Sequence, residues 1–340
     1  MKRLTLAVLL LLACAAMAGV DDDWRQIEAL DAGPKAQWKT RNEARVAALA
    51  HLDVQEKALR NFVAQYPSDP RRVDAQLRLV HLLAARADLQ ENAKPRAEAA
   101  EILERMDVPK NRVADVEFAK VSLFMRRVKP GDDSMRAMLA NKIQDFKKSF
   151  PDDRRVAPLL AELATLYDAE PQRKKTLLEE ARTHAPSDDL RRRIDDDLTR
   201  VSLLGKPLDL KFTSLQGDAI DVEKLLGKVV LVYFFAEWSP PSVAVLDAVH
   251  EIAGGFPTDK VQPLGISLDE NPDTAKALLK AHKINWPVYC DGKGWESPLV
   301  HSFGVNSLPT FWILDRAGKL RTLNARDDAP ALIAQLLREN

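Results

Sequence analysis

Apolar residues recur at helical spacing between residues 21 and 204, in a background rich in Ala, Leu, Arg, Glu and Asp. This segment contains only two glycines, Gly33 and Gly131. Glycine weakens a helix interior more than any residue except proline, so its scarcity favours helices over the whole segment. We therefore predict an all-α region over residues 19–204.

The helical region contains an internal repeat. Residues 59–83 align with residues 143–166, so that Phe62 matches Phe146 and Tyr66 matches Phe150. Four junctions of the kind helix, proline, polar residue, helix occur, 42, 42 and 35 residues apart, at Pro67, Pro109, Pro151 and Pro186. Proline should end one helix at each junction, and the Asp, Ser or Asn after it should cap the next.

Helical hairpins of this length cannot bury their own apolar faces, so neighbouring hairpins are expected to stack into an α-solenoid. The spacing and the aromatic residue before proline resemble tetratricopeptide repeats, and we describe the region as TPR-like. An irregular helical bundle is the alternative. Stacked hairpins of this kind offer extended surfaces for protein partners.

The pattern changes at Gly205 and Pro207, where "LDLKFT" and "GDAIDV" alternate as in a β-hairpin. Beyond it we predict strands at residues 229–236, 261–268, 286–290, 310–315 and 319–324, and helices at 240–254, 272–282, 296–303 and 327–338. The run "VVLVYFF" has no charged residue, as expected of a central strand covered on both faces. Strands that alternate with helices predict an α/β domain over residues 205–340.

The first 18 residues are typical of a secretory signal peptide. Lys2 and Arg3 precede an apolar run that ends in the small-residue pattern Ala-Met-Ala, and cleavage is expected after Ala18. The run is too short to be a permanent membrane anchor, so we expect a bacterial periplasmic or secreted protein. The alternative is a lipoprotein signal that would lipidate Cys14. The next acidic residues, Asp21 to Asp23, would form a flexible start.

The charge balance and the histidine spacing do not indicate a nucleic-acid partner or a metal site. The 50 basic and 50 acidic residues balance, which disfavours nucleic acid as a partner. The six histidines lack metal-ligand spacing and no phosphate-binding loop is present, so we expect neither a metal nor a cofactor. The acidic run from Asp195 to Asp197 follows three arginines and predicts a solvated helix face.

The turn after the central strand carries the candidate chemistry. Its residues are Trp238, Ser239, Pro240, Pro241 and Ser242. Together with "LGISLDE" (264–270), "WPVYCD" (286–291) and "GVNSLPTFWILDRAGKL" (304–320), this turn resembles the TlpA/ResA-like, AhpC/TSA-related branch of the redoxins over residues 205–340. The resemblance implies a thioredoxin-like fold.

The resemblance also implies functional positions. The family has W-C-P-P-C at this turn, where one cysteine attacks a disulfide and the other resolves it, and a cis-proline opposite shapes the substrate groove. Trp238 matches the tryptophan that shields the pair, and Pro309 matches the cis-proline. Ser239 and Ser242 stand at the two cysteine positions. Oxygen cannot exchange disulfides, so the family reaction is excluded at this site.

The two serines allow three interpretations. Ser239 before Pro240 is a typical N-cap, which is the structural interpretation. A serine nucleophile would need a base, and the histidines on offer are His250, His282 and His301. The third interpretation is ligand binding through the hydroxyls at the helix start.

Cleavage after Ala18 would leave Cys290 as the only cysteine, so no intramolecular disulfide is possible. Cys290 is expected to end the strand "WPVYC" as a buried and inert side chain. A reactive or intermolecular thiol is the alternative, although the Thr-x-x-Cys motif of a peroxiredoxin is missing.

These observations predict a protein- or peptide-binding module. A groove between the 238–242 turn and Pro309 would hold an extended peptide. The alternative is a thiol-disulfide oxidoreductase or peroxiredoxin-like antioxidant that acts through Cys290 or through the thiols of a partner.

Overall fold

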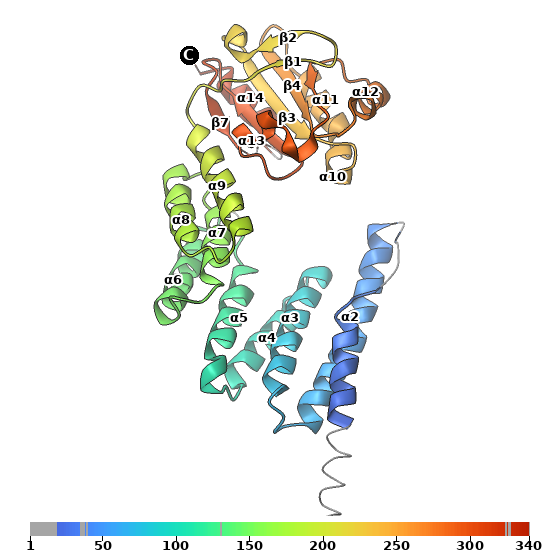
Figure 1. The fold of residues 1–340 in the computed structure, drawn as a ribbon, viewed down its shortest axis with the longest axis vertical. Helices are drawn as coiled ribbons and strands as arrows, with labels where there is room; N and C mark the ends of the chain where they lie inside the picture. The colour runs from blue at the N-terminus through green and yellow to red at the C-terminus, as the bar shows by residue number, and fades with distance from the viewer. Residues whose placement is uncertain are drawn as a thin grey trace, which may run out of the picture. The chain divides into compact units, whose positions relative to one another are not determined.

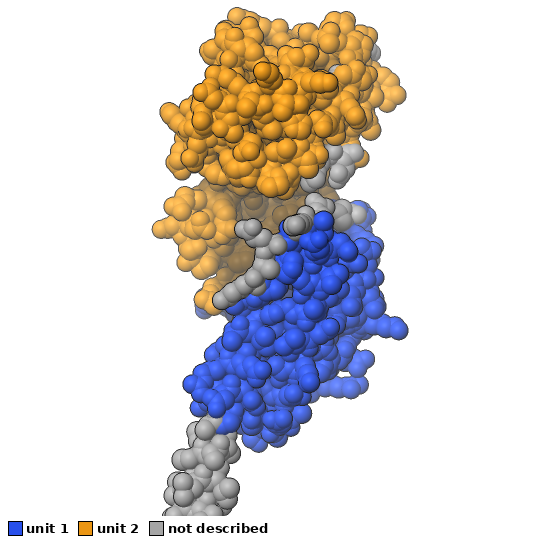
Figure 2. Space-filling model, turned by 90° about the vertical axis from the view of Figure 1, so that its right-hand side faces the viewer, with its two compact units in different colours: residues 1–153 blue, residues 154–340 orange. Residues whose placement is uncertain are grey.

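A computed structural model describes residues 19–34, 38, 40–129, 131–323, 325 and 328–339. The chain divides into two compact units, residues 1–153 and 154–340 (Figure 2). The predicted signal peptide, with Cys14, lies outside the described residues. Within the residues that are described, no helix is long and apolar enough to cross a membrane.

The first unit is helical, as predicted (Figure 1). After a helical segment at residues 19–30, its elements are α2 (Arg41–Gln65), α3 (Arg72–Gln90), α4 (Ala93–Arg105), the 3-10 turn η1 (Lys110–Arg112), α5 (Val113–Met125) and α6 (Asp133–Ser149). One buried cluster joins residues from segment 19–30 with residues from α2 to α5. Burial of this shared apolar surface holds the helices together.

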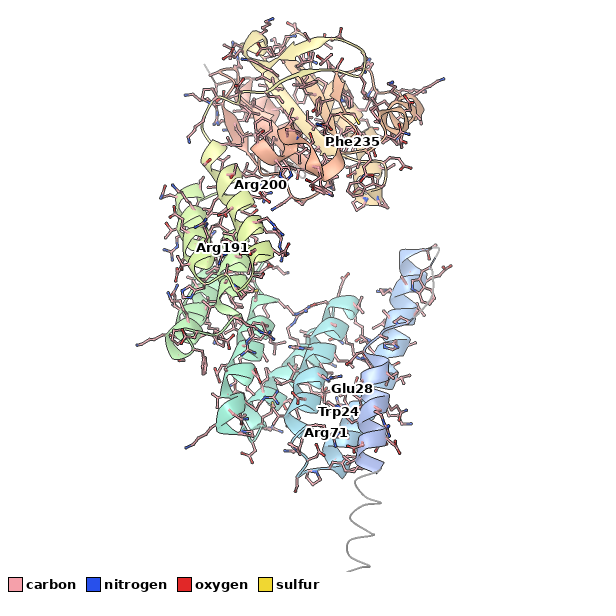
Figure 3. All side chains as sticks on the ribbon, viewed as in Figure 1. Trp24, Glu28, Arg71, Arg191, Arg200 and Phe235 are labelled. Carbon is pink, nitrogen blue, oxygen red and sulfur yellow. The ribbon has the colours of Figure 1, made fainter. Side chains whose placement is uncertain are left out.

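The start of the described chain is ordered, so the prediction of a flexible Asp21–Asp23 segment is wrong. Trp24 is 9% exposed and packs on Phe62 with ring centroids 5.1 Å apart. The Tyr66 hydroxyl donates to Asp23 at 2.7 Å. The Arg71 guanidinium lies 2.8 Å from the Asp21 carboxylate, close to Trp24 in Figure 3. The acidic residues therefore help to fasten this helix to α2 and α3.

The internal repeat has a structural counterpart at the ends of α2 and α6. Phe62 and Tyr66 have ring centroids 5.0 Å apart at 56°, and Phe146 and Phe150 have centroids 5.2 Å apart at 49°. The Tyr66 amide donates to the Phe62 carbonyl at 3.0 Å, and the Phe150 amide donates to the Phe146 carbonyl at 2.8 Å. Aligned residues thus end aligned helices in the same way. The TPR-like classification itself stays a prediction.

The predicted caps after the prolines form at only one of the four junctions. Ser187 accepts the Leu190 amide at 3.3 Å and caps α9. Helices α3, α5 and α7 begin without a side-chain cap. At the first junction Asp69 instead accepts the Arg71 amide at 2.8 Å and its guanidinium at 2.9 Å. The acidic residue there stabilises the turn and not the helix end.

The second unit begins with helices and continues as an α/β domain (Figure 1). Its helices are α7 (Val156–Thr165), α8 (Pro171–Thr183), α9 (Asp188–Leu203), α10 (Pro240–Val243), α11 (Leu246–Gly254), α12 (Pro272–Ala281), α13 (Pro298–Ser302) and α14 (Ala329–Leu336), with 3-10 turns η2 (Val222–Leu225) and η3 (Gly294–Glu296). Its strands are β1 (Lys211–Thr213), β2 (Ala219–Asp221), β3 (Val229–Phe235), β4 (Val261–Ser267), β5 (Val288–Tyr289), β6 (Thr310–Leu314) and β7 (Leu320–Thr322).

Five strands form one sheet in the order β5-β4-β3-β6-β7, and β1 pairs with β2 in a separate hairpin. Strands β3, β4 and β5 are parallel, whereas β6 runs antiparallel to β3. Every residue of β3 is buried, because successive side chains enter two cores on opposite faces of the sheet. One core includes residues of α11, α12 and α14, and the other includes residues of α13 and the β1-β2 hairpin. The predicted α/β thioredoxin-like architecture is confirmed.

Two predicted elements are wrong in detail. The helix expected at 240–254 is interrupted, since α10 ends at Val243 and α11 begins at Leu246. The strand expected at 286–290 is reduced to β5, because Pro287 has no amide to donate to the ladder. Cys290 consequently lies in the loop after the strand.

Helices α7 to α9 belong to the same compact unit as the sheet, so the predicted boundary at residue 205 falls inside that unit. The acidic run on α9 is not the solvated face that was predicted. Asp197 is 24% exposed at its side chain, pairs with Arg200 and accepts the Asn306 amide group at 3.2 Å. Asp195 pairs with Arg182 of α8 at 2.5 Å. The run therefore makes tertiary contacts at two of its positions.

Candidate functional site

The candidate site lies where the three parallel strands end. Strands β3, β4 and β5 are parallel and end at Phe235, Ser267 and Tyr289, so the loops that follow leave the same edge of the sheet. Figure 3 labels Phe235 at the end of β3. The Leu268 amide donates to the Phe235 carbonyl at 2.8 Å, which holds two of these loops together. Ligands of open α/β sheets bind outside this edge.

The serine pair is buried and self-satisfied. Ser239 is 7% exposed and Ser242 is 0% exposed. The Ser242 hydroxyl donates to the Ser239 hydroxyl at 2.9 Å. Ser239 occupies the N-cap position of α10, but its side chain makes no capping hydrogen bond, so the predicted cap is right in position and wrong in mechanism. The Tyr233 hydroxyl donates to the Ser242 carbonyl at 2.7 Å and fixes the helix to β3.

This arrangement also bears on the other two interpretations of the serines. In the described chain, His250 stacks on Trp286, His282 lies 2.7 Å from Asp247, and His301 lies 3.7 Å from Glu296. None of these three histidines makes a hydrogen bond to the serine pair, so none of them is placed to activate a serine. Ser242 is fully buried and Ser239 is 7% exposed, so the two hydroxyls offer little accessible surface to a ligand.

A buried carboxylate that the sequence analysis missed orders the loop. Asp269 is 1% exposed and accepts the Glu237 amide at 2.9 Å and the Ser267 hydroxyl at 2.7 Å. A buried carboxylate is costly unless such donors satisfy it. It therefore ties the turn after β3 to the end of β4. The only signal for it in the sequence is an acidic residue just after a predicted strand.

Two tryptophans form the exposed surface of the site. The Trp238 indole N–H donates to the Leu268 carbonyl at 3.2 Å, while 49% of the residue remains exposed. Trp295, in η3, is 38% exposed and lies with its ring centroid 6.1 Å from that of Trp238. Exposed tryptophans are uncommon, because their large apolar surface gains much from burial. Trp238 was predicted from the sequence, whereas Trp295 was not.

Pro309 lies next to the same edge of the sheet. The peptide bond between Leu308 and Pro309 is cis, as the resemblance implied. Thr310, which follows it, begins β6 and pairs with Phe234 near the end of β3. The Thr310 hydroxyl donates to the Ser307 carbonyl at 2.8 Å and braces the loop.

Cys290 lies beside the site. Its thiol donates to the Asp269 carbonyl at 3.3 Å, one residue from the carbonyl that binds Trp238. The side chain is only partly buried, so the prediction of a buried residue at a strand end is wrong. Burial raises the pKa of the neighbouring Tyr289 phenol, whose O–H donates to Asp291 at 3.0 Å. Among the described residues there is no group of three or more His, Cys, Asp or Glu that could hold a metal ion.

Comparison with known proteins shows what the C-terminal region of the chain resembles. Residues 205–323 match the model of the AhpC/TSA family. The chain is 28% identical over 108 residues to the thiol-disulfide oxidoreductase ResA of Bacillus thuringiensis subsp. konkukian, covering 32% of this chain and 61% of that protein. It is 23% identical over 110 residues to the sporulation thiol-disulfide oxidoreductase A of Bacillus subtilis, covering 32% of this chain and 64% of that protein. The chain thus spans about three fifths of the length of these curated relatives.

Among solved structures, the C-terminal domain of a putative thiol-disulfide oxidoreductase from Bacteroides thetaiotaomicron is 23% identical, with a TM-score of 0.38. The match covers 40% of this chain and 97% of that domain. The order of the strands, the cis peptide bond before Pro309 and the match to the family model all indicate a thioredoxin-like fold for the C-terminal region. Residues 205–323 therefore form a thioredoxin-like domain that is similar to the AhpC/TSA family.

Proposed function

We propose that this protein is a periplasmic or secreted binding protein whose thioredoxin-like domain holds extended polypeptides and carries out no thiol-disulfide exchange at the family site. The observation that carries the proposal is the serine pair, whose buried hydroxyls bind each other at 2.9 Å. Exchange requires a thiolate that attacks a disulfide sulfur, and neither position can supply one.

The exposed surface of the site supports a binding role. Trp238 and Trp295 retain 49% and 38% exposure, which is a large apolar area to leave in water. Aromatic side chains of this kind are enriched where proteins bind other chains, because burying them upon binding is favourable. The Pro309 loop lies along the same edge and completes a surface suited to an extended segment.

A binding measurement with a matched control tests the proposal. The probe is a reduced and alkylated polypeptide, which is permanently unfolded and has no disulfide or free thiol. We expect the full chain to bind it and W238A/W295A to bind it about tenfold more weakly, since two aromatic contacts are lost. The control is W38A, because Trp38 is 42% exposed and lies outside the site. Equal affinities for the wild type and W238A/W295A would contradict the proposal.

A second candidate function rests on the position of Cys290. Its thiol is partly exposed and lies one carbonyl away from the Trp238 contact. A partner that carries a disulfide could form a mixed disulfide with this thiol and release its own second sulfur as a thiol. If the mixed disulfide persists, the partner is bound covalently. If a second thiol of the partner attacks the mixed disulfide and releases Cys290, the protein acts as an oxidoreductase. Mass spectrometry of C290S and wild-type protein after incubation with an oxidised peptide distinguishes the two functions.

A further inference from the structure

The first compact unit contains a groove between its helices. It has a volume of about 530 Å³ and is lined by residues of α4, α5 and α6. Its α4 wall presents Ala93, Ala97 and Ala100, which are exposed and spaced so that they share one helix face. Leu123 and Phe124 of α5 also line it. Short side chains on one wall and larger apolar ones on the other leave an apolar recess open to solvent.

The groove lining is predominantly basic. Its charged lining residues are Arg96, Lys120, Arg127, Lys142 and Glu104. Two of the cations are neutralised locally: Arg96 pairs with Asp88, and the Lys120 ammonium lies 3.0 Å from Glu117 and 3.8 Å from Glu104.

The other two cations that line the groove are not neutralised in this way. Over the described residues, Arg127 and Lys142 form no ion pair, and both lie against the Phe124 ring, 5.5 Å and 5.2 Å from its centroid. The face of the Phe124 ring attracts each of these cations. A carboxylate of a ligand would pair with them beside the apolar lining of the groove.

We propose that the α4–α5–α6 groove binds a peptide segment in which an apolar side chain stands next to a carboxylate. The apolar side chain enters the recess between the alanines of α4 and Phe124, and the carboxylate lies between Arg127 and Lys142. A peptide fits better than an acyl chain, since the exposed alanine wall leaves the groove too open to enclose a lipid tail. This binding is independent of the Trp238–Trp295 site.

Peptide selection on the full chain tests the proposal. The probe is a library of random octapeptides with free C-termini, selected separately against the wild type, against R127E/K142E and against a control. The control is K57E/K110E, which makes the same change in net charge at exposed lysines outside the groove. We expect the wild type and the control to enrich peptides with Asp, Glu or the terminal carboxylate next to Leu, Ile, Met or Phe.

The variant R127E/K142E should lose this enrichment, and an enriched peptide should bind to it at least about tenfold more weakly than to the wild type. Replacing the peptide carboxylate by an amide should weaken wild-type binding to a similar extent. R127Q/K142Q provides the same test if charge reversal disturbs folding, which circular dichroism would reveal. Absence of acidic peptides from the wild-type selection, or their retention by R127E/K142E, would overturn the proposal. A different outcome would also overturn the proposal. In it, no peptide is enriched, and the wild type but not R127E/K142E cosediments with phosphatidylglycerol vesicles.

Discussion

Arg200 of α9 donates a hydrogen bond of 2.6 Å to the carbonyl of Gly304, 104 residues further along the chain. The same guanidinium pairs with Asp197 and donates to the Asn306 side chain, so one cation joins a helix to the loop that leads towards Pro309 (Figure 3). Burial lowers the pKa of Arg200 to about 10, even though Asp196 and Asp168 act in the opposite direction. The charge is held in place by its hydrogen bonds.

Removal of this cation should destabilise the second unit. We expect R200M to lower the free energy of unfolding by about 3 kcal/mol, because it removes the ion-pair partner of Asp197 and the hydrogen-bond donor to the Gly304 carbonyl. The matched control is R191M on the same helix. Arg191 is 43% exposed at its side chain and pairs with exposed Asp188, so its loss should cost under about 1 kcal/mol. Chemical denaturation followed by near-ultraviolet circular dichroism measures both, and similar losses would contradict the assignment.

Gly304 should be irreplaceable for a different reason. Its φ is +62°, and a Cβ at this position would lie 2.4 Å from the Asp196 carbonyl oxygen. G304A should therefore cost about 3 kcal/mol, the sum of a left-handed backbone and a clash with α9. Gly217 is the control, since its φ is +95° but nothing lies within 4 Å of its added Cβ. G217A should cost about 1 kcal/mol, and a loss as large as that of G304A would show that backbone conformation alone matters.

The helices and strands could be predicted because each depends on the spacing of apolar residues within a short stretch of the chain. The uncharged run that became β3 predicts a strand covered on both faces, and both faces are indeed covered by core residues. Pro309 and Trp238 could be placed because their neighbours along the chain resemble a family. The serine pair was found in the same way. The sequence spacing of Ser239 and Ser242 is compatible both with a helix cap and with a hydrogen bond between the two hydroxyls, and the structure shows the hydrogen bond.

The missed contacts join residues that are distant in sequence. Trp295 meets Trp238 across the ends of two different strands, and Asn306 meets Asp197 across 109 residues. No periodicity connects such positions. The Asp195–Asp197 run was misinterpreted for the same reason, since its partners lie on other elements. Acidic residues on a helix look solvated until the neighbouring elements are known.

The residue pattern of the first 18 residues predicts a signal peptide that is cleaved after Ala18. The mature protein should begin at Gly19 and carry no lipid, because the small-residue pattern before the cleavage point suits signal peptidase. Intact mass spectrometry of protein from the native host measures the start directly. A mass that fits a chain starting at a diacylated Cys14 would establish the lipoprotein alternative instead.

Cys290 should react slowly in the folded protein. Its thiol is partly buried and lies 3.3 Å from the Asp269 carbonyl, so a reagent has limited access to the sulfur. We expect a thiol reagent to label native protein at least about tenfold more slowly than protein unfolded in denaturant at the same pH. W238A serves as a second measurement, since loss of the indole opens the neighbouring loop and should accelerate labelling. Equally fast labelling of native and unfolded protein would favour a reactive thiol.

Restoring sulfur to the serine pair should restore part of the family chemistry. The two hydroxyl oxygens lie 2.9 Å apart, close enough that cysteines in their place could reach a disulfide bond with small shifts. Wild-type protein should show no reduction of insulin disulfides, whereas S239C/S242C/C290S should show measurable turnover. The single-cysteine variant S239C/C290S is the matched control, because it can attack a disulfide but cannot resolve the mixed product.

These variants separate the loss of sulfur from the loss of the site. Trp238 and the cis bond before Pro309 are already in place, so activity in the double-cysteine variant would mean that the serines alone removed the redox function. Turnover by the wild type would refute the non-redox proposal. If the double-cysteine variant folds, forms its disulfide and still does not reduce insulin, the exposed surface around Trp238 and Trp295 has become specialised for ligands other than a disulfide substrate.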